Sequence, residues 1–233
     1  MFNRSQKIQK TNNYGKFIVI EGSDGSGKHT QAEKLAQTLR DNGYEVFECG
    51  FPQYKEVTGQ LVSKYLNGEY RNANAKAVSI LYAVDRFNGS TQIQEALDQG
   101  KIVVCDRYYL SNAGHQGSKI ENKDARISFY KWLQELEFEV FEIPKPHLNI
   151  ILSVPAEVSL QLLKKRNLDQ NRSTDIHESD INHLNRAVEV YNELSELIPN
   201  TKQINCYKDG QLLSIEAIHA QVWELVRRLV LNK

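Results

Sequence analysis

This sequence of 233 residues has few cysteines, no formal net charge and no long apolar run. Its three cysteines, Cys49, Cys105 and Cys206, are unevenly spaced and form no C-x-x-C pair, so no disulfide framework is expected. We expect them to be reduced thiols packed in a core. Lys and Arg together number 29, as do Asp and Glu. This balance argues against broad binding to nucleic acid or to an anionic membrane, because both need a basic excess.

Targeting and membrane segments are also missing from the pattern. No segment approaches the roughly 18 consecutive apolar residues of a membrane-spanning helix. The opening stretch, MFNRSQKIQKTNNYG, has no apolar run of the kind found in a secretory signal. We therefore expect residues 1–14 to form a flexible polar tail and the protein to reside in the cytoplasm.

Short apolar segments alternate along the chain with longer amphipathic ones. The short segments predict strands at 16–21, 45–50, 102–105, 148–154 and 203–206. The amphipathic segments predict helices at 28–42, 58–67, 75–99, 125–141, 156–166, 180–197 and 214–231. This alternation favours one three-layer α/β domain over residues 15–233, with a five-stranded parallel sheet between layers of helices. In such a sheet, ligands bind beyond the carboxyl ends of the strands.

The most polar interruption, KKRNLDQNRSTDIHESD at 164–180, lies between two predicted helices. It has two interpretations at this stage. One is a solvated loop, and the other is a small lid that closes over a phosphate site.

The segment G-S-D-G-S-G-K at 22–28 directly follows the first predicted strand and opens the first predicted helix. This is the G-x-x-x-x-G-K pattern of a P-loop, in which backbone N–H groups converge on phosphate oxygens and Lys28 reaches the β- and γ-phosphates. We therefore predict a P-loop fold that binds ATP. The predicted ATP-binding residues are Gly22, Ser23, Asp24, Gly25, Ser26, Gly27, Lys28, His29 and Thr30.

The position after Lys28 departs from the usual P-loop, because it holds His29 and the hydroxyl of Thr30 comes one residue later. Imidazole is a poor ligand for Mg²⁺, so His29 is expected to be only a first-turn helix residue. The G-K-x-T order resembles that of adenylate kinases. Asp106 ends a buried strand in a Walker-B-like arrangement. Asp106 and Thr30 are thus the expected Mg²⁺ neighbours, acting through metal-bound waters.

Four segments carry a more specific resemblance. They are Asp24 inside the P-loop, F-P-Q-Y at 51–54, L-Y-A-V-D-R at 81–86, and D-R-Y-Y-L-S-N-A-G-H-Q-G at 106–117. Together they resemble the thymidylate kinase family from about residue 16 to residue 231. The resemblance implies phosphorylation of dTMP to dTDP at the expense of ATP, with Mg²⁺, by a homodimer.

The resemblance also implies roles for individual residues near the acceptor nucleotide. Asp24 would accept a hydrogen bond from the sugar 3′-hydroxyl, while Phe51 and Tyr54 would lie near the acceptor phosphate. Tyr82 would stack on the base, and Arg86, four residues later on the same helical face, would bind the base edge.

The last segment supplies further expected contacts. Arg107 would bridge the transferring and accepting phosphates with a geometry that lysine lacks. Ser111, Asn112 and Gln116 would meet the pyrimidine edge, and His115 lies where many relatives carry a tyrosine near the ribose 2′-position.

The expected lid would complete the charge around the phosphates. Arg166 and Arg172 are its candidate arginines, with Asp175 and Glu178 to orient them. The predicted catalytic set is therefore Lys28, Asp106, Arg107, Arg166 and Arg172.

Two alternatives stay open from the sequence. The chain is either a kinase of another acceptor, such as dUMP or a nucleoside, or a nucleotide-binding module without turnover. Deoxynucleoside kinases usually carry E-R-S where this chain has D-R-Y, and the intact Lys28, Asp106 and Arg107 disfavour the binding module.

Overall fold

The computed structural model describes residues 14–70, 73–170 and 180–232. Five parallel strands form its main sheet, in the spatial order β2-β3-β1-β4-β5. The strands are β1 Lys16–Glu21, β2 Val46–Gly50, β3 Ile102–Asp106, β4 Leu148–Ser153 and β5 Thr201–Asn205. The predicted five-stranded parallel sheet flanked by helices is confirmed, with strand ends that differ by one or two residues.

The helices of the described residues are α1 Lys28–Asp41, α2 Val57–Leu66, α3 Ala75–Asp98, α4 Tyr109–Gly117, α5 Lys123–Glu135, α6 Ala156–Gln170, α7 Ile181–Leu197 and α8 Ile215–Leu229. A π-helical turn, Leu136–Val140, continues α5. Strands β6 Tyr207–Lys208 and β7 Gln211–Leu212 pair in a separate hairpin whose turn contains Asp209 and Gly210, both at positive φ.

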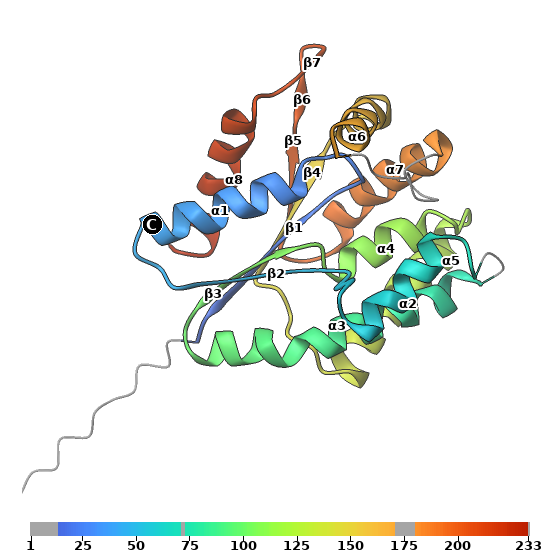
Figure 1. The fold of residues 1–233 in the computed structure, drawn as a ribbon, viewed down its shortest axis with the longest axis horizontal. Coiled ribbons are helices and arrows are strands. Elements are labelled where there is room, and N and C mark those ends of the chain that lie inside the picture. The colour runs from blue at the N-terminus through green and yellow to red at the C-terminus, as the bar shows by residue number, and fades with distance from the viewer. Residues whose placement is uncertain (1–13, 71–72, 171–179, 233) are drawn as a thin grey trace, which may run out of the picture.

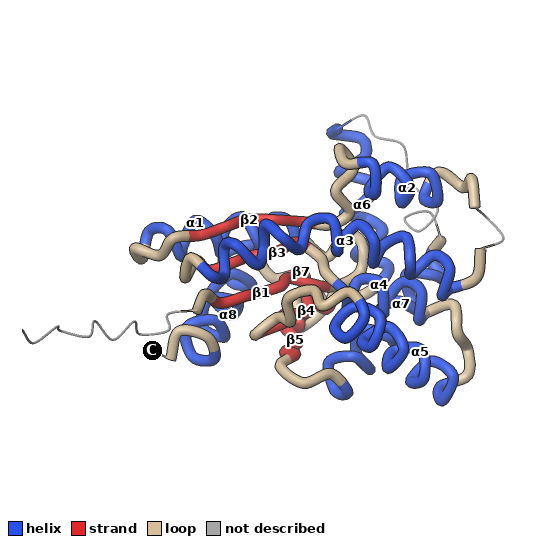
Figure 2. The backbone as a smooth tube through the Cα atoms, turned by 90° about the horizontal axis from the view of Figure 1, so that it is seen from below, coloured by secondary structure: helices blue, strands red, loops and turns tan. Residues whose placement is uncertain are grey.

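The helices cover both faces of the sheet because alternate side chains of its central strand point in opposite directions. Phe17 and Val19 of β1 pack in a core that includes side chains of α3, α4, α5 and α7. Ile18 and Ile20 pack in a second core, against α1 and α8. Figures 1 and 2 show the resulting three layers, with the sheet in the middle.

Helix α4 was not predicted. Its sequence, Y-L-S-N-A-G-H-Q-G, contains two glycines and lacks the apolar periodicity of a surface helix. Eight of its nine residues are nevertheless buried, among them Asn112, His115 and Gln116. The polar residues are buried because α4 packs between other helices and a large pocket, so tertiary packing outweighs weak helix propensity.

Two predicted helices have different ends. The helix expected at 125–141 begins at Lys123 and changes at Leu136 to the π-helical turn. The helix expected at 156–166 continues as α6 to Gln170, so the first part of the segment expected as a lid, 164–170, is helical. Residues 171–179 lie outside the described part of the chain, as do residues 1–13 of the expected N-terminal tail.

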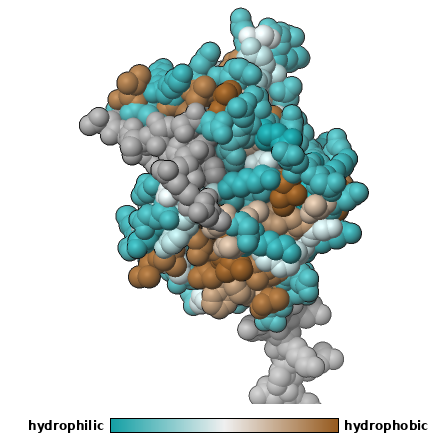
Figure 3. Space-filling view, turned by 90° about the vertical axis from the view of Figure 1, so that its right-hand side faces the viewer, coloured by the Kyte–Doolittle hydropathy of each residue, from teal (hydrophilic) through white to brown (hydrophobic). Residues whose placement is uncertain are grey.

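The surface seen from the right-hand end of Figure 1 is mixed, with hydrophilic side chains over much of it and apolar groups between them (Figure 3). Within the described residues, each helix is either too short or too polar to cross a bilayer.

Candidate functional site

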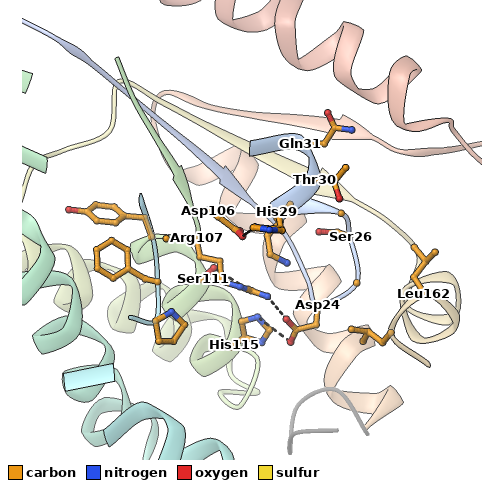
Figure 4. Close-up of a pocket in the computed structure, with 18 of the residues that line it drawn as sticks. Asp24, Ser26, His29, Thr30, Gln31, Asp106, Arg107, Ser111, His115 and Leu162 are labelled. Carbon is orange, nitrogen blue, oxygen red and sulfur yellow. Dashed lines mark hydrogen bonds and ion pairs between the residues drawn. The ribbon is translucent and has the colours of Figure 1, made fainter. Parts of the chain in front are cut away.

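A pocket of about 880 Å³ lies at the carboxyl ends of β1 and β3. These strands are neighbours in the sheet, with Ile20 in register with Asp106, so the loops that follow them meet at one edge (Figure 4). Most of the predicted site residues line this pocket: Asp24, Gly25, Ser26, Gly27, Lys28, His29, Thr30, Phe51, Tyr54, Tyr82, Arg86, Asp106, Arg107, Ser111, Asn112, Gln116 and Arg166. Side chains far apart in sequence are therefore brought together around one cavity.

Two residues of the predicted ATP-binding set support the loop from behind. Gly22 and Ser23 are buried and do not line the pocket. Gly22 packs against the backbone of β4, where an added Cβ would lie 2.6 Å from the Leu152 carbonyl oxygen. The carbonyl oxygen of Ser23 accepts a hydrogen bond from Lys28 Nζ at 2.6 Å. Both residues shape the loop from beneath its pocket surface.

The P-loop turns into α1 in a way that suits an anion. Gly25 and Gly27 have φ values of 78° and 84°, a left-handed conformation that favours glycine. Gly27, the N-cap, has no side chain with which to cap the helix, and the first turn of α1 holds no acidic residue. The first N–H groups of α1 are thus left for another acceptor, at the positive end of the helix dipole. The buried hydroxyl oxygen of Ser26 also has no hydrogen-bond partner among the described residues.

Lys28 is 5 % exposed and lies among several charges. Burial and, to a smaller extent, the positive charge of Arg107 lower the pKa of the Lys28 ammonium to about 7. The negative charges of Asp24 and Asp106 oppose this shift. A buried ammonium with a lowered pKa is stabilised when an additional negative charge arrives. The pocket floor is therefore electrostatically suited to a phosphate.

Asp106 and His29 contact each other at the pocket floor. His29 Nδ1 lies 3.3 Å from Asp106 Oδ2, and its Nε2 lies 3.2 Å from Glu33 Oε1. The expectation that His29 is only a first-turn helix residue is thus incomplete. Asp106 Oδ1 is buried and has no hydrogen-bond partner among the described residues.

A metal ion at this place would not be held by protein groups alone. Among the described residues there is no cluster of three or more His, Cys, Asp or Glu side chains fit to hold a metal. Mg²⁺ commonly uses one or two carboxylates together with phosphate oxygens and waters. The unpartnered Asp106 Oδ1, with Thr30 lining the same pocket, fits that pattern.

Arg107 projects from the end of β3 with a φ of 69°, a value unusual for a residue with a side chain. Its backbone N–H donates to the carbonyl of Ile20 at 3.0 Å, and its Nη2 donates to Asp24 Oδ1 across the pocket (Figure 4). Strained backbone conformations of this kind concentrate at functional sites. The strain aims the guanidinium at the P-loop.

Glu21, the last residue of β1, was missed in the sequence. It is fully buried, and its carboxylate accepts hydrogen bonds from Tyr108 N at 2.8 Å, Ser111 N at 3.2 Å and Ser111 Oγ at 2.6 Å. Burial raises the pKa of Glu21, although these hydrogen bonds oppose the rise. The sequence feature that could have identified Glu21 is a charged residue at the end of an otherwise apolar strand.

The bonding of Ser111 differs from its expected contact with a pyrimidine edge. Its hydroxyl donates to Glu21, and Arg107 Nη1 lies 3.4 Å from the same oxygen. The side chain therefore belongs to the Glu21–Arg107 network.

Asp85 organises the F-P-Q-Y segment and was also missed. It is 1 % exposed and accepts hydrogen bonds from Gln53 N at 2.9 Å and from Thr58 Oγ1 at 2.8 Å. Phe51 is buried at the pocket wall, whereas Tyr54 is 48 % exposed at its mouth. The carboxylate fixes the loop that carries both rings.

Two amides from α4, those of Asn112 and Gln116, line the pocket, and protein partners set the orientation of each. Asn112 Nδ2 donates to the carbonyl of Ser79 at 3.0 Å, which leaves Oδ1 buried without a partner among the described residues. Gln116 Oε1 accepts a hydrogen bond from Lys119 Nζ at 2.9 Å, and Gln116 Nε2 is likewise buried without a partner among the described residues. The pair therefore offers one acceptor and one donor.

Arg86, expected at a base edge, also lines the pocket, and its guanidinium is at the same time held from behind. Its guanidinium forms a buried ion pair with Glu137 of the π-helical turn. Tyr82 is partly buried near it and packs edge-on against Tyr65, with ring centroids 6.4 Å apart. An arginine that lines a pocket while it is paired from behind has a fixed direction.

His183 of α7, which had no predicted role, is partly buried beside the site. Its Nε2 lies 3.2 Å from Nδ1 of His115, and the two rings are stacked with centroids 5.5 Å apart. His115 Nε2 lies 3.9 Å from Asp24 Oδ2 (Figure 4). Helix α7 thus contributes to the site through a residue that the sequence did not indicate.

Of the two arginines expected in the lid, Arg166 lies in α6 and lines the pocket, with its Nη2 3.3 Å from Asn167 Oδ1. Arg172, Asp175 and Glu178 lie outside the described residues.

A glycine-lined phosphate loop after β1, an aspartate at the end of β3 followed by an arginine, and the strand order β2-β3-β1-β4-β5 define a P-loop kinase. The family model described as thymidylate kinase matches residues 20–222. The chain belongs to the thymidylate kinase family.

Individual relatives agree with the family model. A probable thymidylate kinase of Pyrococcus horikoshii is 35 % identical over 224 residues, which cover 94 % of this chain and 98 % of that relative. A thymidylate kinase of Mycobacterium tuberculosis is 32 % identical over 182 residues, or 76 % of this chain and 85 % of the relative. The solved structure of a thymidylate kinase from Candida albicans has a TM-score of 0.70 at 25 % identity and covers 92 % of both chains.

Proposed function

We propose that this protein transfers the γ-phosphoryl group of ATP to dTMP and so forms dTDP. Membership of the thymidylate kinase family supports this activity. The composition of the pocket supports it independently. The P-loop and the oriented amides of Asn112 and Gln116 line one cavity. Arg107 links these two parts, because it pairs with Asp24 of the P-loop and its Nη1 lies 3.4 Å from Oγ of Ser111, the residue before Asn112. Such a cavity suits two nucleotides that meet through their phosphates.

The fixed donors and acceptors support a thymine-like base as the acceptor. Thymine presents an N–H group between two carbonyl oxygens. Asn112 Oδ1 would accept from that N–H, while Gln116 Nε2 and the guanidinium of Arg86 would donate to the oxygens. Cytosine carries an amino group in place of one oxygen and lacks the N–H, so the same three groups would match it less well.

The chain's own residues act by positioning and by charge. Phosphoryl transfer proceeds through a loose transition state whose negative charge spreads over the transferred group. Lys28 and Arg107 would flank that group from opposite sides, and Arg166 would approach it from α6. Asp24 would accept a hydrogen bond from the sugar hydroxyl on its side of the cavity. No covalent enzyme intermediate is needed.

Mg²⁺ belongs to the proposal as a partner of the triphosphate. Asp106 Oδ1 is the protein oxygen best suited to it, with the Thr30 hydroxyl nearby, both acting through metal-bound waters. When bound, the ion would neutralise developing charge on the phosphates.

The proposal extends to the setting of the protein. We infer a homodimer, as the resemblance implies, and a cytoplasmic location. Light scattering coupled to size-exclusion chromatography tests the first, and a mass of one chain at micromolar concentration would contradict it. Fractionation of the source cells tests the second.

The central experiment measures ATP consumption with one acceptor at a time: dTMP, dUMP, dCMP, dGMP or thymidine. We expect the highest kcat/KM with dTMP, and ³¹P NMR should identify dTDP as the product. Faster turnover of thymidine would reassign the protein to the nucleoside kinases. ATP binding without any acceptor-dependent turnover would reduce it to a binding module.

A further inference from the structure

An ion pair between Arg86 of α3 and Glu137 of the π-helical turn lies behind the pocket wall, because Arg86 lines the pocket and Glu137 does not. Arg86 Nε donates to both carboxylate oxygens of Glu137 at 3.0 Å, and Nη2 donates to Oε1 as well. The two side chains are 1 % and 0 % exposed. Glu137 thus takes the Nε–Nη2 edge of a planar group that also lines the pocket.

A pair buried this deeply is not explained by stability. Removing two charges from water is costly, and well-packed apolar residues in their place are often equally stable. Burial alone lowers the pKa of Arg86, but the charge and hydrogen bonds of Glu137 outweigh burial and raise it. The guanidinium therefore stays charged and is held in one orientation. A role for that orientation in ligand binding explains the buried pair better than a contribution to stability does.

The backbone around Glu137 is specialised to deliver it. Residues Leu136–Val140 form a π-helical turn after α5. Such turns are rare in proteins overall, but many of those that occur lie at functional sites. The turn directs Glu137 inward to full burial. Glu139, two residues later, points outward, is 68 % exposed and pairs with Lys145 at 2.9 Å.

We propose that Glu137 is a positioning residue for base selection, which holds the guanidinium of Arg86 so that its free edge faces a carbonyl oxygen of the acceptor base. This inference rests on the proposed function. A planar arginine discriminates between a carbonyl and an amino group only when its direction is fixed. Loss of Glu137 should therefore weaken both the affinity for dTMP and the preference for dTMP over dCMP.

The test compares Glu137→Gln with the wild-type enzyme in steady-state kinetics. We expect KM for dTMP to rise about tenfold, with kcat within about threefold and KM for ATP unchanged, because base binding is made equally in the ground and transition states. The ratio of kcat/KM for dTMP to that for dCMP should fall by a similar factor. Glu139→Gln, which removes the exposed carboxylate of the same turn, should leave all of these values at wild-type levels.

A double-variant comparison separates positioning from mere support of the fold. Arg86→Gln/Glu137→Gln leaves no unpaired charge in the core and therefore also serves if Glu137→Gln fails to fold. If Glu137 acts through Arg86, the KM of the double variant for dTMP equals that of Arg86→Gln. A further severalfold rise in the double variant would overturn the inference.

The inference and the proposed function fail in different ways. A wild-type enzyme without turnover of dTMP refutes the proposed function. A wild-type enzyme that phosphorylates dTMP, alongside a folded Glu137→Gln variant with unchanged KM and unchanged dCMP discrimination, refutes the role of Glu137 alone.

Discussion

Arg107 and Asp24, 83 positions apart in the sequence, form an ion pair that joins the end of β3 to the P-loop. Each partner is mostly buried, with 22 % and 13 % of its side chain exposed. A phosphate that enters between them would compete with Asp24 for the guanidinium. The pair therefore holds Arg107 close to its proposed working position before any nucleotide binds.

Replacement of this arginine tests the proposed role of its planar fork. We expect Arg107→Lys to lower kcat at least ~100-fold, because one preorganised donor to the transition state is worth about 10²–10³ in rate. A lysine keeps the charge but loses the bidentate geometry. The matched control is Arg40→Lys, at an exposed arginine of α1 that pairs with Glu48. Rates within twofold of wild type for Arg107→Lys would remove Arg107 from the catalytic set.

A second prediction concerns Lys119, which orients the amide of Gln116. Lys119→Met should raise KM for dTMP about three- to tenfold, since Gln116 loses the partner that turns its Nε2 into the pocket. Isothermal titration of dTMP should show the same loss of affinity. Lys76→Met is the control. Lys76 stands over the ring of Trp132, 4.9 Å from its centre, as Lys119 stands over the ring of Tyr65, but Lys119 in addition donates to Gln116, which lines the pocket. Equal effects of the two substitutions would contradict the prediction.

Local sequence was sufficient for the P-loop and for the strands, because both depend on contiguous residues. The run G-S-D-G-S-G-K after an apolar strand is specific enough to predict a P-loop from the sequence alone. Strands β1, β3 and β4 were found because they are nearly continuous apolar runs that are buried on both faces. Strand β5, T-K-Q-I-N, has only two buried residues, and its predicted start came two residues too late. The sheet order places their ends together, so most of the predicted residues line one pocket.

Residues that act through distant partners were not predictable in the same way. Glu137 is 51 positions from Arg86, and His183 is 68 positions from His115. Nothing in the surrounding residues distinguishes Glu137 from the other acidic residues of E-L-E-F-E. Only the π-helical turn, which depends on tertiary packing, turns one of these carboxylates inward.

The third prediction follows from the buried carboxylate of Glu21. Burial raises its pKa above the ordinary 4.5, so the folded state holds a proton that the unfolded state has released over the pH range between the two values. The free energy of unfolding contributed by Glu21 is complete below pH 4.5 and is lost as pH rises through the folded-state pKa. A tenfold difference in the acid dissociation constant between the two states corresponds to ~1.4 kcal/mol.

Glu21→Gln removes this titration. The stability of the variant relative to wild type should therefore increase from pH 4.5 upward and level off once the folded-state pKa is passed. Urea unfolding at half-unit pH steps measures the difference. Glu45→Gln removes an exposed carboxylate and controls for the change in net charge. A difference between Glu21→Gln and wild type that is constant across pH would refute the raised pKa.

The last prediction separates backbone strain from close packing in the P-loop. Gly25 and Gly43 have nearly the same conformation, with φ of 78° and 83°. A Cβ on Gly25 would lie 2.5 Å from the carbonyl oxygen of Ser159 in α6, whereas a Cβ on Gly43 would meet nothing within 4 Å. Alanine at either position should cost ~1–2 kcal/mol of stability through strain. Gly25→Ala must in addition push the loop away from α6.

We therefore expect Gly25→Ala to raise the Kd for ATP at least ~10-fold and to lower Tm further than Gly43→Ala, which should bind ATP like wild type. Nucleotide titration and thermal unfolding of both variants measure the two effects. Because the strain is matched, the difference between them reports the contact of Gly25 with Ser159. Equal ATP affinity in the two variants would show that the loop binds nucleotide without close packing on α6.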